Sequence, residues 1–202
     1  LNHPNVCKIL YADVVPINGS SYALIAQEIQ EKGSITNHLN AQNFLSLNKT
    51  IKVIREVLCG LEHLHYNSII HNDIKPSNIL VNANGQAVLT DYGISGYSHP
   101  SEPTVPKSAY IPHRAPETAS DTPLISHATD IFQMGLTFFR LLNGITTIEN
   151  DLKRMGNSEF ENAKANGTLV TAKKYLPFIP ASLKRIIAKS LKPNPTERYE
   201  SA

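Results

Sequence analysis

Three residues of different polar chemistry, Asp73, Lys75 and Asn78, lie within six consecutive positions of the 202-residue chain. A second aspartate, Asp91, follows Asp73 by 18 positions. Carboxylate and amide oxygens are ligands for a hard cation such as Mg²⁺, which takes its other ligands from water and phosphates. A carboxylate can accept the proton of a hydroxyl nucleophile, and an ammonium group can neutralise charge on a phosphoryl oxygen. Together these groups have the chemistry that phosphoryl transfer requires.

A purely structural turn is the alternative interpretation, because aspartate and asparagine also cap backbone groups in turns. The flanking sequence favours a site. Apolar runs at 79–81 and 87–89 are separated by a segment containing Asn84 and Gly85, a pair typical of a β-hairpin. Such a hairpin turns the chain back and brings Asp91 beside Asn78.

Several helices and one strand are expected to position these residues. Apolar residues recur at helical spacing over residues 46–66 and again over 181–191, which predicts two amphipathic helices. Residues 131–142 are apolar on nearly every face, which predicts a buried helix. Residues 22–29 predict a strand. Residues 95–112 contain four prolines and predict a long loop, and loops of this length are commonly functional.

Composition excludes several classes of protein. The 19 basic and 17 acidic residues are nearly balanced, which argues against a nucleic-acid partner. The two cysteines, Cys7 and Cys59, are too few for a disulfide framework and are predicted to be small buried hydrophobic residues. No apolar run approaches the roughly 18 residues of a membrane span. We therefore expect an intracellular, cytoplasmic protein without a membrane segment.

On these residues the chain resembles the eukaryotic-type protein kinases. Their catalytic loop, His-Arg-Asp with a lysine two positions and an asparagine five positions after the aspartate, corresponds here to His71, Asn72, Asp73, Lys75 and Asn78. Their Asp-Phe-Gly motif corresponds to residues 91–93, and their Ala-Pro-Glu motif to residues 115–117. Because several motifs occur in the family's order at compatible spacings, the resemblance is specific.

The resemblance implies roles for the catalytic residues. Asp73 is the base that orients the substrate hydroxyl, Lys75 contacts the transferred phosphate, and both are catalytic. Asn78 and Asp91 hold Mg²⁺ and thereby the nucleotide. A lysine two positions after the base is typical of serine/threonine kinases. The implied substrate is a protein serine or threonine, and the implied cofactors are ATP and Mg²⁺.

The resemblance also implies an adenine pocket. Backbone groups of Glu28 and Gln30 bond the adenine, Leu80 forms the floor beneath it, and Thr90 lines the same pocket. Gln27 takes the gatekeeper position behind the nucleotide.

Other matching positions imply structural roles. Asp130 anchors the backbone of the catalytic loop, and Arg198 pairs with Glu117 of the Ala-Pro-Glu motif. Tyr92 replaces the motif's phenylalanine and is expected to be tolerated, because its ring is kept and its hydroxyl needs only one partner. Asn72 replaces the arginine that receives an activation-loop phosphate in many relatives, so control by that route is expected to be weaker or absent.

The implied fold class is α+β: a protein-kinase-like fold, mainly its helical C-terminal lobe, with a remnant of the N-terminal lobe sheet and the hinge. Residues 1–29 are assigned to the N-terminal remnant, and residues 30–202 to the C-terminal lobe, truncated near its last helix. The sequence contains no Gly-x-Gly-x-x-Gly loop. We therefore expect a partial kinase domain, and a pseudokinase or truncated scaffold that binds partners without catalysis is the alternative.

Overall fold

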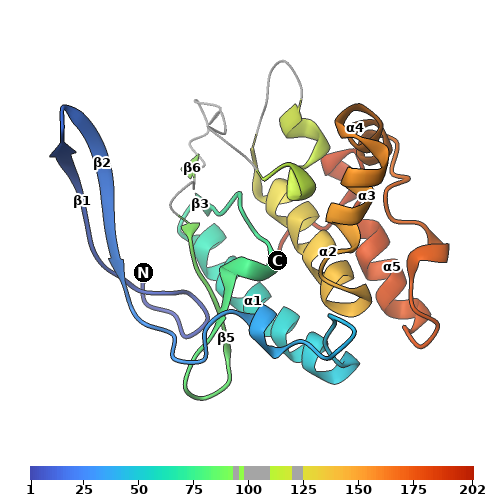
Figure 1. Ribbon diagram of the computed structural model, residues 1–202, viewed down its shortest axis with the longest axis horizontal. Coiled ribbons are helices and arrows are strands. Elements are labelled where there is room, and N and C mark those ends of the chain that lie inside the picture. The colour runs from blue at the N-terminus through green and yellow to red at the C-terminus, as the bar shows by residue number, and fades with distance from the viewer. Residues whose placement is uncertain (93–95, 98–109, 120–124) are drawn as a thin grey trace.

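Two long helices carry much of the buried core in the computed structural model, which describes residues 1–92, 96–97, 110–119 and 125–202. Helix α1 spans Leu47–Tyr66 and helix α2 spans His127–Asn143. The two helices pack against each other and lie at the centre of Figure 1. Both predicted helices are confirmed, and α2 is buried along nearly its whole length.

Helix α2 begins four residues earlier than its apolar run. The Thr129 hydroxyl accepts a hydrogen bond from the Ser126 amide at 3.0 Å, and the Thr129 amide donates to the Ser126 carbonyl at 2.9 Å. These bonds satisfy backbone groups that a helix start leaves without partners. The first turn therefore forms without apolar residues.

The described residues contain three shorter α-helices. Helix α5, Ala181–Ser190, confirms the predicted C-terminal helix and packs on α2. Helices α3, Thr147–Met155, and α4, Asn157–Ala165, were not predicted. Each is nine residues long with few buried residues, so the apolar periodicity that predicts a helix is too short to recognise in the sequence.

The predicted hairpin between the helical regions is confirmed. Strands β4, Ile79–Val81, and β5, Ala87–Leu89, are antiparallel, with Ile79 opposite Leu89. Gly85 takes a positive φ of 73° in the turn, a conformation that glycine adopts without steric cost. The hairpin packs on α1.

Part of the predicted loop forms a strand. Strand β3, Ile69–Ile70, pairs with β6, Gly96–Tyr97, in an antiparallel ladder. The register of such a two-residue pair depends on tertiary contacts, so local sequence does not predict it. Residues 98–109 of the predicted loop, and Gly93 of the motif at 91–93, lie outside the described residues.

An N-terminal hairpin stands away from the helices (Figure 1). Strand β1, Ile9–Ile17, pairs antiparallel with β2, Ser20–Gln27. The predicted strand at 22–29 thus lies two residues too late, and β1 was missed. Side chains on both strands are largely exposed, so the alternation of apolar and polar residues that predicts a half-buried strand is weak here. The Asn18-Gly19 turn, with φ of 50° and 79°, was an available hairpin signal.

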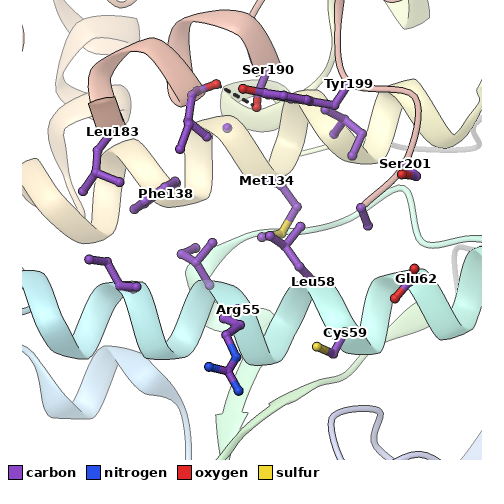
Figure 2. A pocket seen from close by; sticks show the side chains of 16 residues that line it. Arg55, Leu58, Cys59, Glu62, Met134, Phe138, Leu183, Ser190, Tyr199 and Ser201 are labelled. Atoms are coloured by element: carbon purple, nitrogen blue, oxygen red, sulfur yellow. Dashed lines mark hydrogen bonds between the residues drawn. The ribbon is translucent and has the colours of Figure 1, made fainter. Parts of the chain in front are cut away.

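The prediction for the cysteines is half wrong. Cys7 is buried, but Cys59 is exposed on α1. It lies in the wall of an apolar cavity of about 490 Å³ between α1, α2 and α5, with Met134 and Phe138 on the opposite side (Figure 2). None of the residues predicted to be catalytic lines this cavity. Among the described helices, none is long and apolar enough to cross a membrane.

The predicted pair of Arg198 and Glu117 is confirmed as a two-pronged ion pair, with both nitrogen-to-oxygen distances at 2.8 Å. The Arg198 side chain is 0% exposed. Its remaining N–H groups donate to the carbonyls of Lys192, Ala128 and Pro193 at 2.7 to 2.9 Å. One side chain therefore ties the Ala-Pro-Glu segment to α2 and to the C-terminal segment.

Candidate active site

The centre of the candidate site is the carboxylate of Asp73, which is 3% exposed. The Lys75 ammonium donates to Asp73 Oδ2 at 2.6 Å, and Asn78 Nδ2 donates to the same oxygen at 2.9 Å. Asn78 Nδ2 also donates to the Asp73 carbonyl at 2.9 Å. Both donors occupy one carboxylate oxygen, and no described residue donates a hydrogen bond to Oδ1, which leaves Oδ1 as an acceptor for a further group.

The hairpin returns the chain to Asn78, and Asp91 directly follows the point of contact. The Thr90 amide donates to the Asn78 carbonyl at 3.0 Å, and Asp91 is the next residue. Asp91 is exposed and has a φ of +64°. This conformation is uncommon for residues other than glycine, and such backbone strain is often found at functional sites.

The donor atoms fit a hard cation. Since the Asn78 amide nitrogen is bonded to Asp73, its Oδ1 is turned away from that residue. In the part of the chain that the structure describes, this oxygen receives a single long contact, at 3.4 Å from Ser77 Oγ. Within the described part of the chain, no hydrogen bond or ion pair engages the Asp91 carboxylate. One amide oxygen and one carboxylate match a Mg²⁺ site that is completed by water and phosphates.

Asp130 anchors the catalytic loop, as the resemblance implied. Its Oδ1 accepts from the Asn72 amide at 2.7 Å, and its Oδ2 accepts from the His71 amide at 2.9 Å. Gln133, one turn further along α2, was missed: its Oε1 accepts from the Ile74 amide at 2.8 Å, and its Nε2 donates to the Asn72 carbonyl at 3.0 Å. Consecutive backbone groups around Asp73 are thereby held by α2.

His71 has a structural role in this arrangement. Its Nδ1 accepts from the Asp73 amide at 3.2 Å, so Nε2 carries the proton and donates to the Thr90 carbonyl at 3.0 Å. The ring is fully buried, and this burial lowers the pKa of His71. A neutral His71 therefore links the catalytic loop to the strand that delivers Asp91.

A second buried histidine, His113, supports the loop from the other side and was missed. Its ring accepts from Arg140 Nη1 at 2.6 Å, so the opposite nitrogen donates to the Ile74 carbonyl at 2.8 Å. Burial, and next the charge of Arg140, hold the pKa of His113 well below its usual range. His113 and Arg140 are 27 positions apart and belong to no shared motif, so the sequence alone does not predict their contact.

The segment before the Ala-Pro-Glu motif is held by a buried lysine. Lys164 on α4 donates to the carbonyls of Ile111 and Arg114 at 3.1 and 2.8 Å and lies 3.0 Å from the Glu161 carboxylate. Burial lowers the pKa of Lys164 to about 8, although the Glu161 charge opposes the shift.

This lysine predicts a pH dependence of stability. Between about pH 8 and its unfolded value of 10.5, the unfolded state binds more protons at Lys164 than the folded state, so stability contributed here rises with pH. Relative to Lys164→Met, the wild type should gain free energy of unfolding between pH 8 and 10, with a slope of up to about 1.4 kcal/mol per pH unit. Urea denaturation of both proteins across this range measures the difference. If the wild type gains no free energy of unfolding relative to Lys164→Met over this range, the lowered pKa is contradicted.

The residues implied to contact adenine are only partly brought together. Glu28 and Gln30 line a cavity of about 610 Å³, whose lining among the described residues does not include Leu80 or Thr90. The Glu28 carbonyl receives only the weak Cys7 thiol donor, at 3.4 Å. The Gln30 carbonyl accepts from the Gly33 amide within a turn. Leu80 is half-buried on β4, on the face opposite the buried Ile79 and Val81.

Two contacts tie the hinge region to the site. The Thr90 hydroxyl donates to Oε1 of Gln27 at 3.0 Å, so the residue at the gatekeeper position contacts the strand before Asp91. The Tyr92 hydroxyl donates to the Cys7 carbonyl at 2.8 Å. The single partner expected for this tyrosine is therefore present.

Asn72 occupies an unusual environment. It is 1% exposed with a φ of +61°, and neither side-chain polar atom has a hydrogen-bond partner within the described ranges. An asparagine carries no charge to pair with a phosphate. Residues 98–109 of the predicted loop, where such a phosphate would be attached, lie outside the described residues.

The fold and this site together define a class of protein. The family model for the protein kinase domain matches residues 1–202, so the chain belongs to the protein kinase domain family. Its curated relatives include serine/threonine-protein kinase PrkC of Bacillus subtilis, 28% identical over 204 residues, with 100% of this chain and 30% of the relative covered. Calcium/calmodulin-dependent protein kinase kinase of Caenorhabditis elegans is 30% identical over 207 residues, with 98% of this chain and 36% of the relative covered. The chain spans about a third of the length of these relatives.

Proposed function

We propose that the protein is a serine/threonine kinase that transfers the γ-phosphate of ATP to a hydroxyl group of a protein. The observation that carries the proposal is the shared use of Asp73 Oδ2 by Lys75 and Asn78, at 2.6 and 2.9 Å. This arrangement holds the carboxylate rigidly and leaves Oδ1 for a substrate hydroxyl. The names of the relatives, one a serine/threonine-protein kinase and the other a protein kinase kinase, support the same class.

In the proposed reaction, the substrate oxygen forms a bond to the γ-phosphorus while the bond from that phosphorus to ADP breaks. Asp73 orients the hydroxyl and accepts its proton. Lys75 lies close enough to Asp73 to neutralise charge on the transferred group. Asn78 Oδ1 and the Asp91 carboxylate would hold Mg²⁺, which supplies further neutralisation of phosphate charge.

A cavity beside the catalytic loop supports access for a protein substrate. It has a volume of about 220 Å³ and includes Thr36, Lys75, Ser77, Tyr110 and Glu149 in its lining. The Lys75 ammonium lies 5.1 Å from the centre of the Tyr110 ring, which fixes one wall next to the catalytic residues. A peptide bound here would pass directly beside Lys75.

We further propose a division at the hinge, with residues 1–29 belonging to a smaller lobe and residues 30–202 to the helical lobe. The support is the hairpin β1–β2, which stands apart from the helices in Figure 1. Two of its apolar side chains, Leu10 and Val14, are more than half exposed.

The test is phosphate transfer by the full-length protein. It is supplied with labelled ATP, Mg²⁺ and otherwise identical peptides that contain serine, threonine or tyrosine as the only acceptor. We expect labelling of serine and threonine peptides that chelation of Mg²⁺ abolishes. ATP binding without transfer to any peptide or protein substrate would instead support the alternative, a kinase-like scaffold.

A further inference from the structure

Two histidines from different helices stack beside the anchor of the catalytic loop. His65 lies near the end of α1, and His127 is the first residue of α2. Their ring centroids are 4.0 Å apart and their planes differ by 7°. His65 Nε2 lies 2.8 Å from Asp130 Oδ2, and the His65 side chain is 7% exposed.

Among the described residues, the His65 imidazole is one of three donors to the Asp130 carboxylate. The other two are the backbone amides of His71 and Asn72, the residues that directly precede Asp73. Asp130 is 0% exposed, so its charge depends on these donors in place of water. A change in the direction of the carboxylate would be transmitted to the backbone that carries Asp73.

His127 is placed to fix the plane of the His65 ring. Without a neighbour on its face, an imidazole can rotate about its side-chain bonds and lose its hydrogen bond. His127 itself is held firmly: the first turn of α2 is closed by the bonds between Ser126 and Thr129, and Arg198 donates to the carbonyl of Ala128 at 2.8 Å. The backbone that carries His127 is therefore held in place, and its ring packs on the face of His65.

The contribution of His127 comes from its ring face. Its Nε2 is buried and has no hydrogen-bond partner among the residues that the structure describes. Burial and the neighbouring His65 lower the pKa of His127, while Asp130 opposes the shift. The start of α2, which carries the positive end of the helix dipole, also disfavours a charged ring here. Because a carboxylate only accepts hydrogen bonds, His65 Nε2 is the donor to Asp130.

We propose that His127 is a positioning residue that acts through His65 and Asp130 on the backbone of the catalytic loop. Its effect on catalysis rests on the proposed kinase function, whereas its effect on the loop backbone does not. The ring must be flat and must fill the space beside His65, and a benzene ring meets both requirements. Phenylalanine is therefore the substitution that should preserve the role.

Amide hydrogen exchange in the full-length protein tests the backbone effect directly. We expect His127→Ala to accelerate exchange at the amides of His71 and Asn72 by about tenfold. This is roughly the effect of losing the free energy that one hydrogen bond contributes against local opening. The Ile74 amide, which is bonded to Gln133, is the internal control and should change little. His127→Phe should exchange like the wild type. Equal acceleration at Ile74, or none at His71 and Asn72, would overturn the proposal.

Kinetics of the full-length protein test the catalytic consequence. We expect His127→Ala to lower kcat by about tenfold through misplacement of Asp73, with the KM for ATP unchanged, and His127→Phe to restore kcat. An unchanged kcat alongside faster exchange would overturn the catalytic part. If the wild type transfers no phosphate, the proposed function fails, while the exchange result still decides the positioning role.

Discussion

Replacing Asp73 by asparagine is expected to lower the rate of phosphate transfer by about 10²- to 10⁴-fold, the range measured for removal of a general base. Asparagine keeps the size of the side chain and an oxygen that Lys75 and Asn78 can bond. It cannot take the proton of a substrate hydroxyl, and it lacks the charge that orients that hydroxyl. The loss should appear in kcat, measured with the full-length protein at saturating ATP and Mg²⁺.

A matched control separates chemistry from a general change in charge. Asp13 on β1 is an exposed carboxylate whose partners are its own neighbours, Tyr11 and Val14. Asp13→Asn should transfer phosphate at the wild-type rate. Urea denaturation should show that Asp73→Asn remains folded. Equal rates for Asp73→Asn and the wild type would refute the assignment of Asp73 as the base.

Replacing Arg198 by alanine is expected to lower the free energy of unfolding by about 3–5 kcal/mol, the cost of breaking a buried ion pair by removing one partner. The substitution leaves the Glu117 carboxylate without its two-pronged partner and removes the donor to the carbonyls of Lys192, Ala128 and Pro193. It also removes the guanidinium that lies 5.0 Å from the centre of the Phe132 ring. Urea denaturation of the 202-residue chain measures the loss.

Two further variants show whether geometry or charge dominates at this position. Arg198→Lys keeps the charge but not the planar fork, so it should recover only part of the lost stability. Arg154→Ala removes an arginine that is 66% exposed and paired with Asp151, and it should change stability by less than about 0.5 kcal/mol. Similar losses for Arg198→Ala and Arg154→Ala would show that the buried pair is not a structural tie.

Much of the site could be predicted because its chemistry is local in sequence. Asp73, Lys75 and Asn78 are close in space because they are close in the chain, and the short turn around them leaves few ways to arrange them. The hairpin turn at Asn84 and Gly85 then delivers Asp91, since two strands of three residues leave little freedom in register.

The supporting residues could not be predicted in the same way. His65 contacts Asp130 across 65 positions of sequence, and Gln133 contacts Ile74 of the loop across 59. Both contacts exist only when α1 and α2 pack. His113 is likewise buried against Ile74 by a segment that has no periodic pattern. The exposed position of Cys59 depends on which face of α1 the remaining helices cover.

The sequence by itself determined the kinase motifs, the main helices and the hairpin, because helix periodicity, turn residues and short motif spacings act over a few residues. Only the tertiary structure decided which oxygen of Asp73 is occupied, which face of the Asn78 amide is free and which histidines hold the loop through Asp130. Those features depend on hydrogen bonds between segments distant in the chain. Their geometry is set when helices α1 and α2 bury their common face, and no local pattern of residues encodes it.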